Sequence, residues 1–572
     1  MQFIEWLILM KRYLTYFSIG CASLFLVGCG VGGGDDSSTP NTTSTCVPGD
    51  DVIGVWKVIA NNQALMPDSP QLSFFSYNQP SVNGDGLVVF RGRAKDATSG
   101  SGEVQRGVYA ANACLPQRSI YTIADTVNTL VPAPNNNNAT FNEFPSIPRV
   151  DLASSLIATR GQSAPVWTYT DSSGASTRVG TSGLYATLPT GLTTGIGILG
   201  NVPEFAYMQV PNASTTGIKF DQFPGTPSVS DKKYLVFKGN YTDTTSKTGV
   251  YYRDLSVSGS PVRMIADSNT AIPGSATKFG STAPPSAANG NVVFLGLDNE
   301  ETPTMGGIYL APIAQTPTLS PLVKIGDSIP KNLDSTLAAT FTQISEGLAF
   351  DGRYVAFWGA WGTSTHALTL TCPKDGNAAL RAACLAAYPT GSTTKDVPNY
   401  QGIFVVDSTT KTVLMVAKAD FTDTSSVFNG FTYWTYSGST EGGDAEPPRW
   451  RSSAFTAVDG KRGVIFKGSS NSTSGTDISG IYGATFTGGP VGRLFKVLAT
   501  GDLMAMLDSS APGASPITSV GIEREGLRNG WLALTASSAD WAGTYVSYFP
   551  KTFTLGNPLS DQHGIYSLIL GN

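Results

Sequence analysis

The sequence has 572 residues, with 37 Lys and Arg against 42 Asp and Glu, and a formal net charge of −5. Charged residues make up 14 % of the chain, against about 25 % in a typical domain. Such a weakly acidic, sparsely charged chain argues against nucleic acid or an acidic polymer as its partner, because those partners are bound through dense basic surfaces.

Residues 1–28 resemble a bacterial lipoprotein signal peptide. Lys11-Arg12 precedes a mostly apolar segment, residues 13–27, and Gly28 is followed by Cys29. A charged start, a short apolar region and a small residue before a cysteine are typical of a signal that is cleaved before a lipid-modified cysteine. The resemblance implies lipid attachment at Cys29.

The same resemblance implies a protein of the Gram-negative cell envelope that is held at the membrane by its N-terminal lipid. Gly30, rather than Asp, follows the cysteine, which favours the outer membrane over the inner one. Residues 29–50 are rich in Gly, Ser, Thr and Asp and are predicted to form a flexible tether. Residues 51–572 are then the folded part.

A turn followed by a run of apolar residues recurs through this folded part. It is clearest at Pro80–Gly92 (PSVNGDGLVVFRG), where Asn83–Gly86 predicts a tight turn because Asn and Gly tolerate positive φ. Leu87–Phe90 then predicts a strand buried on both faces, since it lacks polar and apolar alternation. Six further copies follow, at residues 148–161, 227–239, 285–296, 347–359, 454–468 and 526–536.

Two more patterns follow these copies. One is Gly, then Ile or Val, then an aromatic residue, and it is present at residues 107–109, 249–251, 307–309, 402–404, 480–482 and 564–566. In the second unit Val166-Trp167 is assigned to its place. The other is a short apolar stretch that usually ends in Asp, such as Leu322–Asp327. Each unit therefore has four strands, and four-stranded units at a period of several tens of residues are typical of β-propeller blades.

The sequence thus predicts an all-β fold, a seven-bladed β-propeller of four-stranded antiparallel blades that start near residues 72, 140, 218, 277, 339, 427 and 516. The second and seventh units depart most from the pattern, which leaves six or eight blades as alternatives. The last unit ends after Gly564–Tyr566 without an outer strand. Residues 52–60 match that missing strand. The N-terminal strand is therefore expected to pair in the last blade, near Tyr566, and to close the ring, which removes open sheet edges.

Four cysteines besides Cys29 remain after the signal, and an even number in an exported chain favours disulfides, although the sequence leaves three pairings open. Cys372 and Cys384 lie close together in one insertion, so a local bridge between them is favoured. Cys46 and Cys114 would then join the two blades beside the ring closure. Zinc binding is the alternative, although no CxxC motif or nearby His pair exists.

The long irregular segments follow second or fourth strands, and these connections emerge on one face of a propeller. Ala360–Gln401, which holds a predicted helix at Asn377–Ala387, and Ser537–His563 are two such segments. Function concentrates in loops of this kind, and aromatic platforms suit carbohydrate or peptide. The alternative, that the tryptophans pack between blades, is favoured, above all for Trp358 and Trp531, which adjoin or lie in buried strands. The candidate ligand-face residues are Trp361, His366, Trp434, Trp450 and Trp541.

Catalytic motifs are scarce in the sequence. No GxSxG, HExxH, Walker or EF-hand pattern occurs, so no catalytic residue, metal ligand or cofactor is predicted. Aspartates recur where the outer strand ends, which favours turn capping over catalysis; they are Asp125, Asp267, Asp327 and Asp502.

The units resemble the blades of exported bacterial β-propeller repeat proteins of undefined function and, more distantly, the PxxSPDGxxIAF repeats of TolB-type propellers. The resemblance covers residues 52–572 and implies a fold but no catalytic residues. The favoured function is a non-enzymatic binding or scaffold module whose loop-rich face meets a protein or glycan. The alternative is a glycan-processing hydrolase or lyase at the central channel, which needs two carboxyl groups about 5–10 Å apart.

Overall fold

The computed structural model describes residues 55–95, 103–114, 119–374, 378–438, 447–470 and 478–549. The predicted signal peptide, lipid attachment site and tether lie outside the described residues, and so do Cys46 and Gly564–Tyr566. Within the described ranges, no helix has both the length and the apolar character needed to cross a bilayer.

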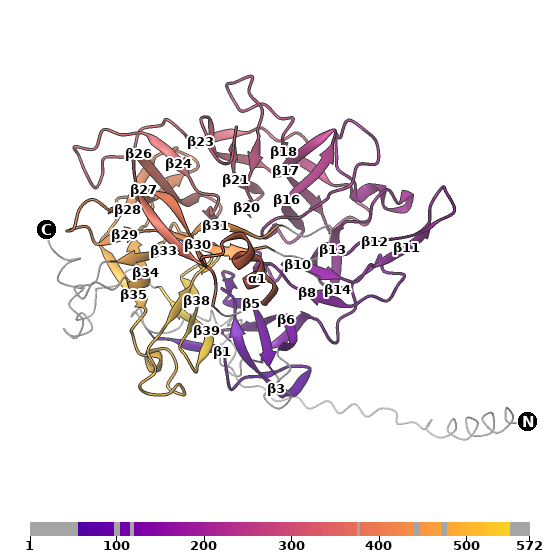
Figure 1. Ribbon diagram of the computed structural model, residues 1–572, viewed down its shortest axis with the longest axis horizontal. Coiled ribbons are helices and arrows are strands. Elements are labelled where there is room, and N and C mark those ends of the chain that lie inside the picture. The colour runs from indigo at the N-terminus through magenta and orange to yellow at the C-terminus, as the bar shows by residue number, and fades with distance from the viewer. Residues whose placement is uncertain are drawn as a thin grey trace, which may run out of the picture. The chain divides into compact units, whose positions relative to one another are not determined.

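Antiparallel strands make up nearly all of the described secondary structure, which confirms the prediction of an all-β chain. These ranges contain six sheets of four to ten strands and two separate two-stranded hairpins. The ten-stranded sheet consists of two strand groups joined by one parallel residue pair, Ala419 with Phe428. Counted separately, they bring the total to seven strand groups, which follow one another in chain order around a common centre (Figure 1).

The first four strand groups lie in the N-terminal half of the chain. The first consists of β2 (Leu65–Met66), β3 (Ser69–Tyr77), β4 (Ser81–Val82), β5 (Leu87–Lys95), β6 (Glu103–Asn112) and β7 (Tyr121–Asp125). The second consists of β8 (Phe141–Glu143), β9 (Arg149–Val150), β10 (Ile157–Ser163), β13 (Ser182–Leu188) and β14 (Gly191–Gly197). The third consists of β15 (Ser228–Ser230), β16 (Tyr234–Asp243), β17 (Thr245–Asp254) and β18 (Arg263–Asp267). The fourth consists of β19 (Ser281–Thr282), β20 (Ser286–Ala288), β21 (Asn291–Leu297), β22 (Gly306–Pro312) and β23 (Ser320–Lys324).

The other three groups complete the set. The fifth consists of β24 (Phe341–Ile344), β25 (Ala349–Phe350), β26 (Tyr354–Thr371), β27 (Ser392–Asp407) and β28 (Val413–Asp420). The sixth consists of β29 (Phe428–Gly430), β32 (Thr456–Asp459), β33 (Gly463–Ser470), β34 (Ile478–Thr485) and β35 (Leu494–Ala499). The last consists of β36 (Ser519–Gly521), β37 (Leu527–Arg528), β38 (Trp531–Ser537), β39 (Ala542–Tyr548) and, from the start of the described chain, β1 (Lys57–Asn61).

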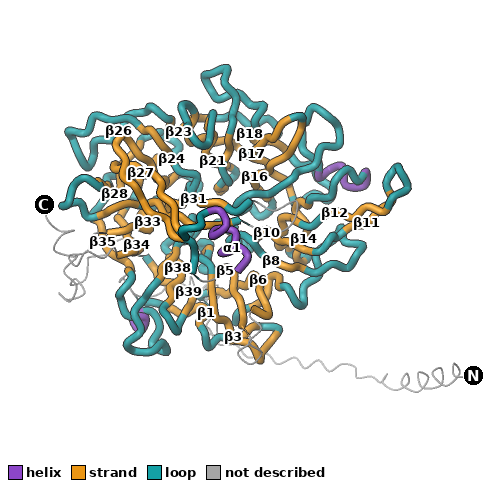
Figure 2. The backbone as a smooth tube through the Cα atoms, in the orientation of Figure 1, coloured by secondary structure: helices purple, strands orange, loops and turns teal. Residues whose placement is uncertain are grey.

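Elements outside these groups are few. The two hairpins are β11 (Trp167–Thr170) with β12 (Ser176–Val179), and β30 (Thr432–Ser437) with β31 (Arg449–Ala454). The helices are α1 (Ala378–Ala387) and the short 3₁₀ helices η1 (Pro203–Met208) and η2 (Met504–Met506). The predicted helix at 377–387 is therefore present as α1. Figure 2 shows how little of the described chain is helical.

One aromatic and glycine cluster explains most of the sequence repeat. A Cβ atom at Gly92, within β5, would come within 2.6 Å of the Phe74 ring, so only glycine leaves room for that ring there. Phe74 meets Tyr109 edge-on, with ring centroids 4.9 Å apart. The same trio returns as Gly161, Phe141 and Tyr185; Gly239, Phe220 and Tyr251; Gly296, Phe279 and Tyr309; Gly359, Phe341 and Phe404; and Gly468, Phe428 and Tyr482.

The sequence assignment of the third strand is wrong in two groups. In the second group the strand paired with β10 is β13, which carries Gly183–Tyr185, whereas Val166-Trp167 leads into the β11–β12 hairpin. In the last group β39 pairs with β38 directly after residues 538–541, so the predicted long loop Ser537–His563 does not start there. The motif in β39 is Gly543–Tyr545, and its central Thr544 hides it from a search for Ile or Val.

β1 is the outer strand of the last group. It pairs antiparallel with β39, from Lys57 opposite Val546 to Asn61 opposite Gly543. The Asn61 amide also donates a 2.7 Å hydrogen bond to Asp508 Oδ2. The partner of the N-terminal strand is thus the strand around Tyr545, while the segment around Tyr566 lies outside the described residues.

Apolar clusters fill the space between neighbouring groups. One cluster contains Phe141, Leu235 and Tyr251 and spans the first three groups, and others join each later group to the next. A further cluster holds Ile59 with Phe90 and Trp531, so the last group packs on the first. Trp531 is therefore a packing residue, as the alternative interpretation of the tryptophans expected.

Candidate binding site

The centre of the strand groups is occupied by the chain itself. Residues 522–528, here called the central segment, follow β36 directly and include β37, and Glu523, Arg524 and Glu525 are all buried. The carbonyl of Glu525 accepts a 2.9 Å hydrogen bond from the Val82 amide of the first group. Arg528 Nη2 donates to the carbonyl of Phe350 in the fifth group at 2.8 Å. The central segment thus connects groups that are far apart in sequence.

A buried ion cluster anchors this segment. Arg149, on β9, is 1 % exposed and pairs through Nη2 with Glu523 Oε1 at 2.9 Å and through Nη1 with Glu525. Burial favours a raised pKa for Glu523, but the charges of Arg149 and Arg524 outweigh it and lower the pKa. These two carboxylates come from one segment and share one arginine, so they are structural counter-ions.

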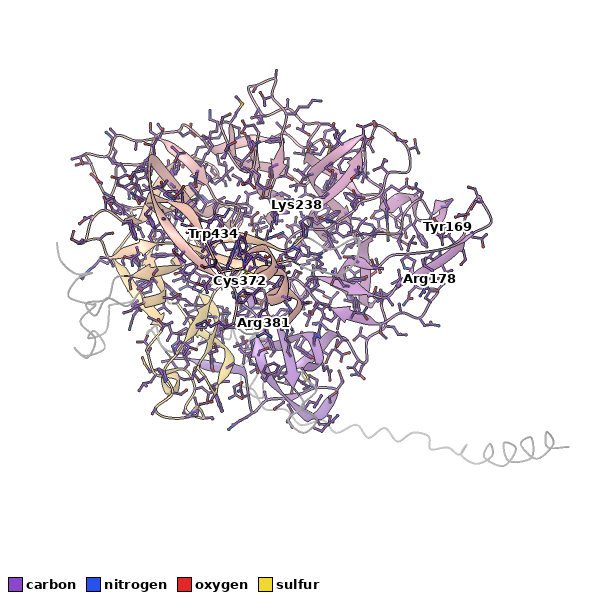
Figure 3. The ribbon with its side chains drawn as sticks, in the orientation of Figure 1. Tyr169, Arg178, Lys238, Cys372, Arg381 and Trp434 are labelled. Carbon is purple, nitrogen blue, oxygen red and sulfur yellow. A yellow bond between two sulfur atoms is a disulfide. The ribbon has the colours of Figure 1, made fainter. Side chains whose placement is uncertain are left out.

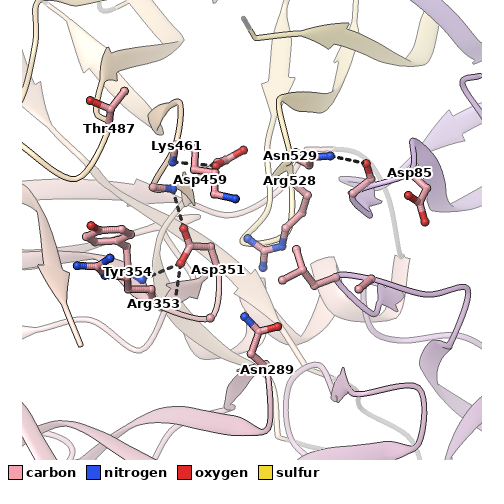
Figure 4. A pocket seen from close by; sticks show the side chains of 15 residues that line it. Asp85, Asn289, Asp351, Arg353, Tyr354, Asp459, Lys461, Thr487, Arg528 and Asn529 are labelled. Carbon is pink, nitrogen blue, oxygen red and sulfur yellow. Dashed lines mark hydrogen bonds between the residues drawn. The ribbon is translucent and has the colours of Figure 1, made fainter. Parts of the chain in front are cut away.

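A pocket of about 550 Å³ opens where the tight turns meet, and is called the turn-face pocket (Figure 4). Asp351 and Asp459 face it from different groups. Asp351 accepts backbone hydrogen bonds from Arg353, Tyr354 and Gly460, and Asp459 accepts them from Lys461 and Gly530. Burial raises the pKa of Asp351, and these hydrogen bonds oppose it. Both carboxylates therefore cap and connect turns.

Two insertions meet at the other end of the centre. β26 and β27 carry α1 between them, and a disulfide joins Cys372 to Cys384, which confirms the predicted local bridge. Both cysteines pack with Tyr436 of the β30–β31 hairpin, beside Trp450. Figure 1 shows α1 and this hairpin close to the common centre. The predicted Cys46–Cys114 pair stays a prediction, because Cys46 lies outside the described residues.

Beside this hairpin lies a groove of about 580 Å³, here called the hairpin groove. Its walls come from β30, from the sixth and last strand groups, and from the first group. The lining residues are Asn62, Phe75, Ser76, Tyr77, Asn78, Gln79, Tyr433, Trp434, Thr435, Phe455, Lys467, Ser519, Val520, Gly521, Thr535, Ala536, Ser537, Ser538, Ala539, Asp540, Trp541 and Ala542. Aromatic rings thus alternate with amides and hydroxyls.

Hydrogen bonds fix several groove residues. Trp541 Nε1 donates to Asp508 Oδ2 at 3.1 Å, the atom that also accepts from Asn61. The Tyr77 hydroxyl donates to the Asn61 carbonyl at 2.8 Å, and burial raises the pKa of Tyr77 well above its ordinary value. The pairing of β1 with the last group therefore holds the floor of the groove in place.

Lys467 is the cation in the wall of the groove. Its Nζ lies 4.4 Å from the ring centroid of Tyr433 and 5.7 Å from that of Phe455. Burial lowers the pKa of Lys467 from 10.5 to about 8. Asp540, exposed at the rim, is the one carboxylate among the described lining residues.

The structure brings two of the five predicted ligand-face residues, Trp434 and Trp541, into the hairpin groove. In Figure 3 Trp434 lies near the centre, whereas Arg178 and the β11–β12 hairpin lie at the periphery. Trp434 is half-buried, and Trp541 is 9 % exposed. The sequence did not indicate Lys467, although its place directly before Gly468, matched by Arg91 before Gly92, is a signal that could have singled it out.

The other three predicted residues lie elsewhere. Trp361 is 3 % exposed and stacks in the core of the fifth group beside Tyr400. His366 stacks on Phe421 at 3.5 Å between ring centroids. Trp450 packs against Tyr436 in the disulfide cluster.

The recurring aspartates cap turns as predicted. Asp125 Oδ1 accepts the backbone N–H groups of Val127, Asn128 and Thr129. Asp267 Oδ1 accepts that of Asn269. Across the described ranges, no three His, Cys, Asp or Glu side chains are grouped so as to hold a metal ion.

No family model and no curated protein matches this chain. It is similar at the level of fold to solved structures that include an oligogalacturonate lyase in complex with manganese, with 9 % identity, 84 % of this chain and 96 % of that chain covered, and a TM-score of 0.39. Another is the β-propeller domain of the Trilobed protease from Pyrococcus furiosus, with 11 % identity, 74 % and 96 % covered, and a TM-score of 0.30. A third is the Pyrococcus horikoshii acylaminoacyl peptidase, with 10 % identity, 74 % and 52 % covered, and a TM-score of 0.27. Likenesses at this level say nothing about what this chain binds.

Proposed function

We propose that this chain is a closed seven-bladed β-propeller that acts as a non-enzymatic binding module. Five of the seven strand groups begin within four residues of the starts expected from the repeats, and the first and third, which begin at Leu65 and Ser228, lie seven and ten residues away. This agreement supports the blade count. The pairing of β1 with β39 and the apolar cluster between the last and first groups support closure. A closed ring leaves no free sheet edge between its ends.

The hairpin groove is the ligand site in this proposal. The observation that carries it is a groove of about 580 Å³ in which six aromatic rings lie among amides and hydroxyls from the first and last strand groups and from β30. The rings are those of Phe75, Tyr77, Tyr433, Trp434, Phe455 and Trp541. Volumes of about 300–1,000 Å³ and a few convergent polar groups characterise small-ligand sites. The ligand is a glycan or a short protein segment, because both combine stacking surfaces with hydrogen-bonding groups.

We further propose that the module is tethered to the bacterial outer membrane through lipid at Cys29 and the flexible residues 29–50. Residues 1–28 would be removed as a signal peptide. The support for this part is the sequence pattern alone. A tethered module would find its ligand among the glycans and proteins of the cell envelope.

Replacing Trp434 by Ala tests the groove. The full chain, purified in detergent, is screened against an oligosaccharide array and, by crosslinking, against envelope proteins. We expect at least one ligand whose affinity falls about tenfold or more in Trp434→Ala, because loss of a central interface aromatic commonly costs more than 1 kcal/mol.

Trp450→Ala is the matched control, since Trp450 lies on the same hairpin but packs on the disulfide cluster outside the groove lining. It should bind like the unmodified chain. Failure of every glycan and every envelope protein to bind, or equal loss in both variants, would contradict the proposed site.

A further inference from the structure

The residue before the second-strand glycine is a cation in four strand groups (Arg91, Arg160, Lys238, Lys467). The residue at the facing position of the next group is a carboxylate in only one of them; the four facing residues are Glu143, Gln222, Ser281 and Ser519. In the first group the residue before the glycine of the second strand is Arg91, whose Nη2 pairs with Glu143 Oε1 of the second group at 2.7 Å. Glu143 lies opposite Gln162, the residue that follows Gly161. In this interface, then, the cation of one group is neutralised by the next group.

Lys467 occupies the same place as Arg91, directly before Gly468, and faces the last group. In the last group Ala536 replaces the glycine of the repeat. The next residue, Ser537, lies opposite Ser519. A serine therefore stands where Glu143 supplied the carboxylate. Within the described residues, no carboxylate lies within ion-pair distance of Lys467, and both Ser519 and Lys467 line the hairpin groove.

Building on the binding function proposed above, we propose that the hairpin groove takes a short saccharide that carries a single carboxylate. The carboxylate would pair with Lys467 Nζ, as Glu143 pairs with Arg91 between the first and second groups. The sugar ring would lie against the half-buried Trp434, and its hydroxyls would meet the amides of Asn78 and Gln79.

Charge and burial favour an anionic ligand here. An unpaired, largely buried ammonium group destabilises the folded chain, and burial lowers the pKa of Lys467 to about 8. The ring of Tyr433 faces the Lys467 ammonium group from β30, and that of Phe455 faces it from the segment before β32. Tyr77 and Asp540 are the other titratable groups of the lining. No acidic side chain among the described lining residues lies deeper in the groove. A ligand carboxylate would supply the missing charge.

The lining favours a saccharide over a peptide. Apart from its rings, the described lining is mostly hydroxyls and amides, which both donate and accept hydrogen bonds as sugar hydroxyls require. The net charge of −5 opposes a long polyanion but not one local carboxylate. A short saccharide with one acidic residue satisfies both conditions.

The test compares trisaccharides that end in one glucuronate with the same trisaccharides after reduction of the carboxyl group, by calorimetry with the full chain. We expect the acidic form to bind at least tenfold more tightly than the reduced form. Lys467→Met should abolish this difference, and Lys467→Arg should keep it. The affinity of the unmodified chain should fall about tenfold between pH 7 and pH 9 as the amine loses its proton, whereas Lys467→Arg should not change.

Lys467→Met should also melt at an unchanged or higher temperature, since a buried cation is removed, so loss of binding would not reflect unfolding. Equal binding of acidic and reduced forms, or unchanged binding by Lys467→Met, would overturn the inference. Binding of only sulfated saccharides, of poly-uronate chains more tightly than trisaccharides, or of a protein through Trp434 would also overturn it while leaving the binding function intact. Absence of any Trp434-dependent ligand would instead refute the proposed function.

Discussion

At the scale of single residues, Arg149 shows how a buried charge depends on its partners. It is almost fully buried, and its guanidinium faces two carboxylates from the central segment. Removing one partner of a buried ion pair strands the other charge in a poorly solvated place, which commonly costs about 3–5 kcal/mol. The cost arises even where the intact pair contributes little net stability.

Arg149→Met should therefore lower the free energy of unfolding by about 3–5 kcal/mol at pH 7. Glu523 has a lowered pKa when folded, so its charged form stabilises the chain above its ordinary value of 4.5, and this contribution is lost as the pH falls through the folded value. Without Arg149, burial would instead raise the pKa of Glu523. The difference in free energy of unfolding between variant and parent should therefore narrow as the pH falls below about 5.

Thermal unfolding from pH 4 to pH 8 measures this effect. Arg178→Met is the matched control, because Arg178 is exposed on the outlying β12 (Figure 3) and should unfold like the parent at every pH. A stability difference between Arg149→Met and the parent that stays constant with pH would contradict the role of Glu523 and Glu525 as counter-ions of Arg149.

At the scale of elements, the α1 insertion is joined to the rest by a small contact. Its apolar cluster consists of Cys372, Cys384 and Tyr436 with a few partly buried neighbours, and it is separate from the larger clusters between strand groups. The disulfide therefore holds a local unit, and its removal should be felt locally.

Replacing Cys372 and Cys384 by Ser should raise protease cleavage within residues 372–392 while the main thermal transition moves little. A short disulfide-closed loop contributes about 3 kcal/mol, here to the local folding of α1. Limited proteolysis and calorimetry of the same samples distinguish the two effects. A fall of the main transition as large as that of Arg149→Met would show that α1 supports the whole molecule.

The elements were predictable where each follows from local chemistry. The turns, the buried second strands, the helix at 378–387 and the local disulfide all follow from residues adjacent in sequence. Gly543–Tyr545 escaped because Thr544 replaces an aliphatic residue, and the long loop expected after Ser537 followed from that error. The ring of Phe74 over Gly92 was equally invisible, because a glycine in the sequence does not say which distant ring covers it.

The groove could be predicted only in part. Trp434 and Trp541 were chosen as exposed aromatics on the loop-rich face, and both line it. Trp361 was chosen on the same grounds but is buried beside Tyr400. Residue type cannot separate these outcomes, because they depend on which strand edge each tryptophan follows. Lys467 was missed since its isolation appears only when the facing residue, Ser519, is known.

At the scale of the whole molecule, β1 joins the two ends of the described chain. Ile59 is 4 % exposed in the cluster between the last and first groups, whereas Val55 is 50 % exposed. Ile59→Asp should lower the free energy of unfolding by several kcal/mol and promote aggregation, because a buried unpaired charge would release β1 and leave the edge of β39 open.

Val55→Asp places the same charge four residues earlier and should leave both properties unchanged. Denaturant unfolding and size-exclusion chromatography measure the two effects. Equal stability of the two variants, with no aggregation of Ile59→Asp, would mean that pairing of β1 with β39 contributes nothing to the stability of the array.

The ion cluster around Arg149 also has a consequence for the order of synthesis. The two partners of the Arg149–Glu523 bond are separated by 374 residues, and a ribosome delivers the chain from its N-terminus. The second group therefore emerges with a cation that has no counter-charge until almost the last residues arrive. Folding intermediates that lack Glu523 should therefore have a poorly packed centre and depend on chaperones. The central segment would complete their packing when it is synthesised.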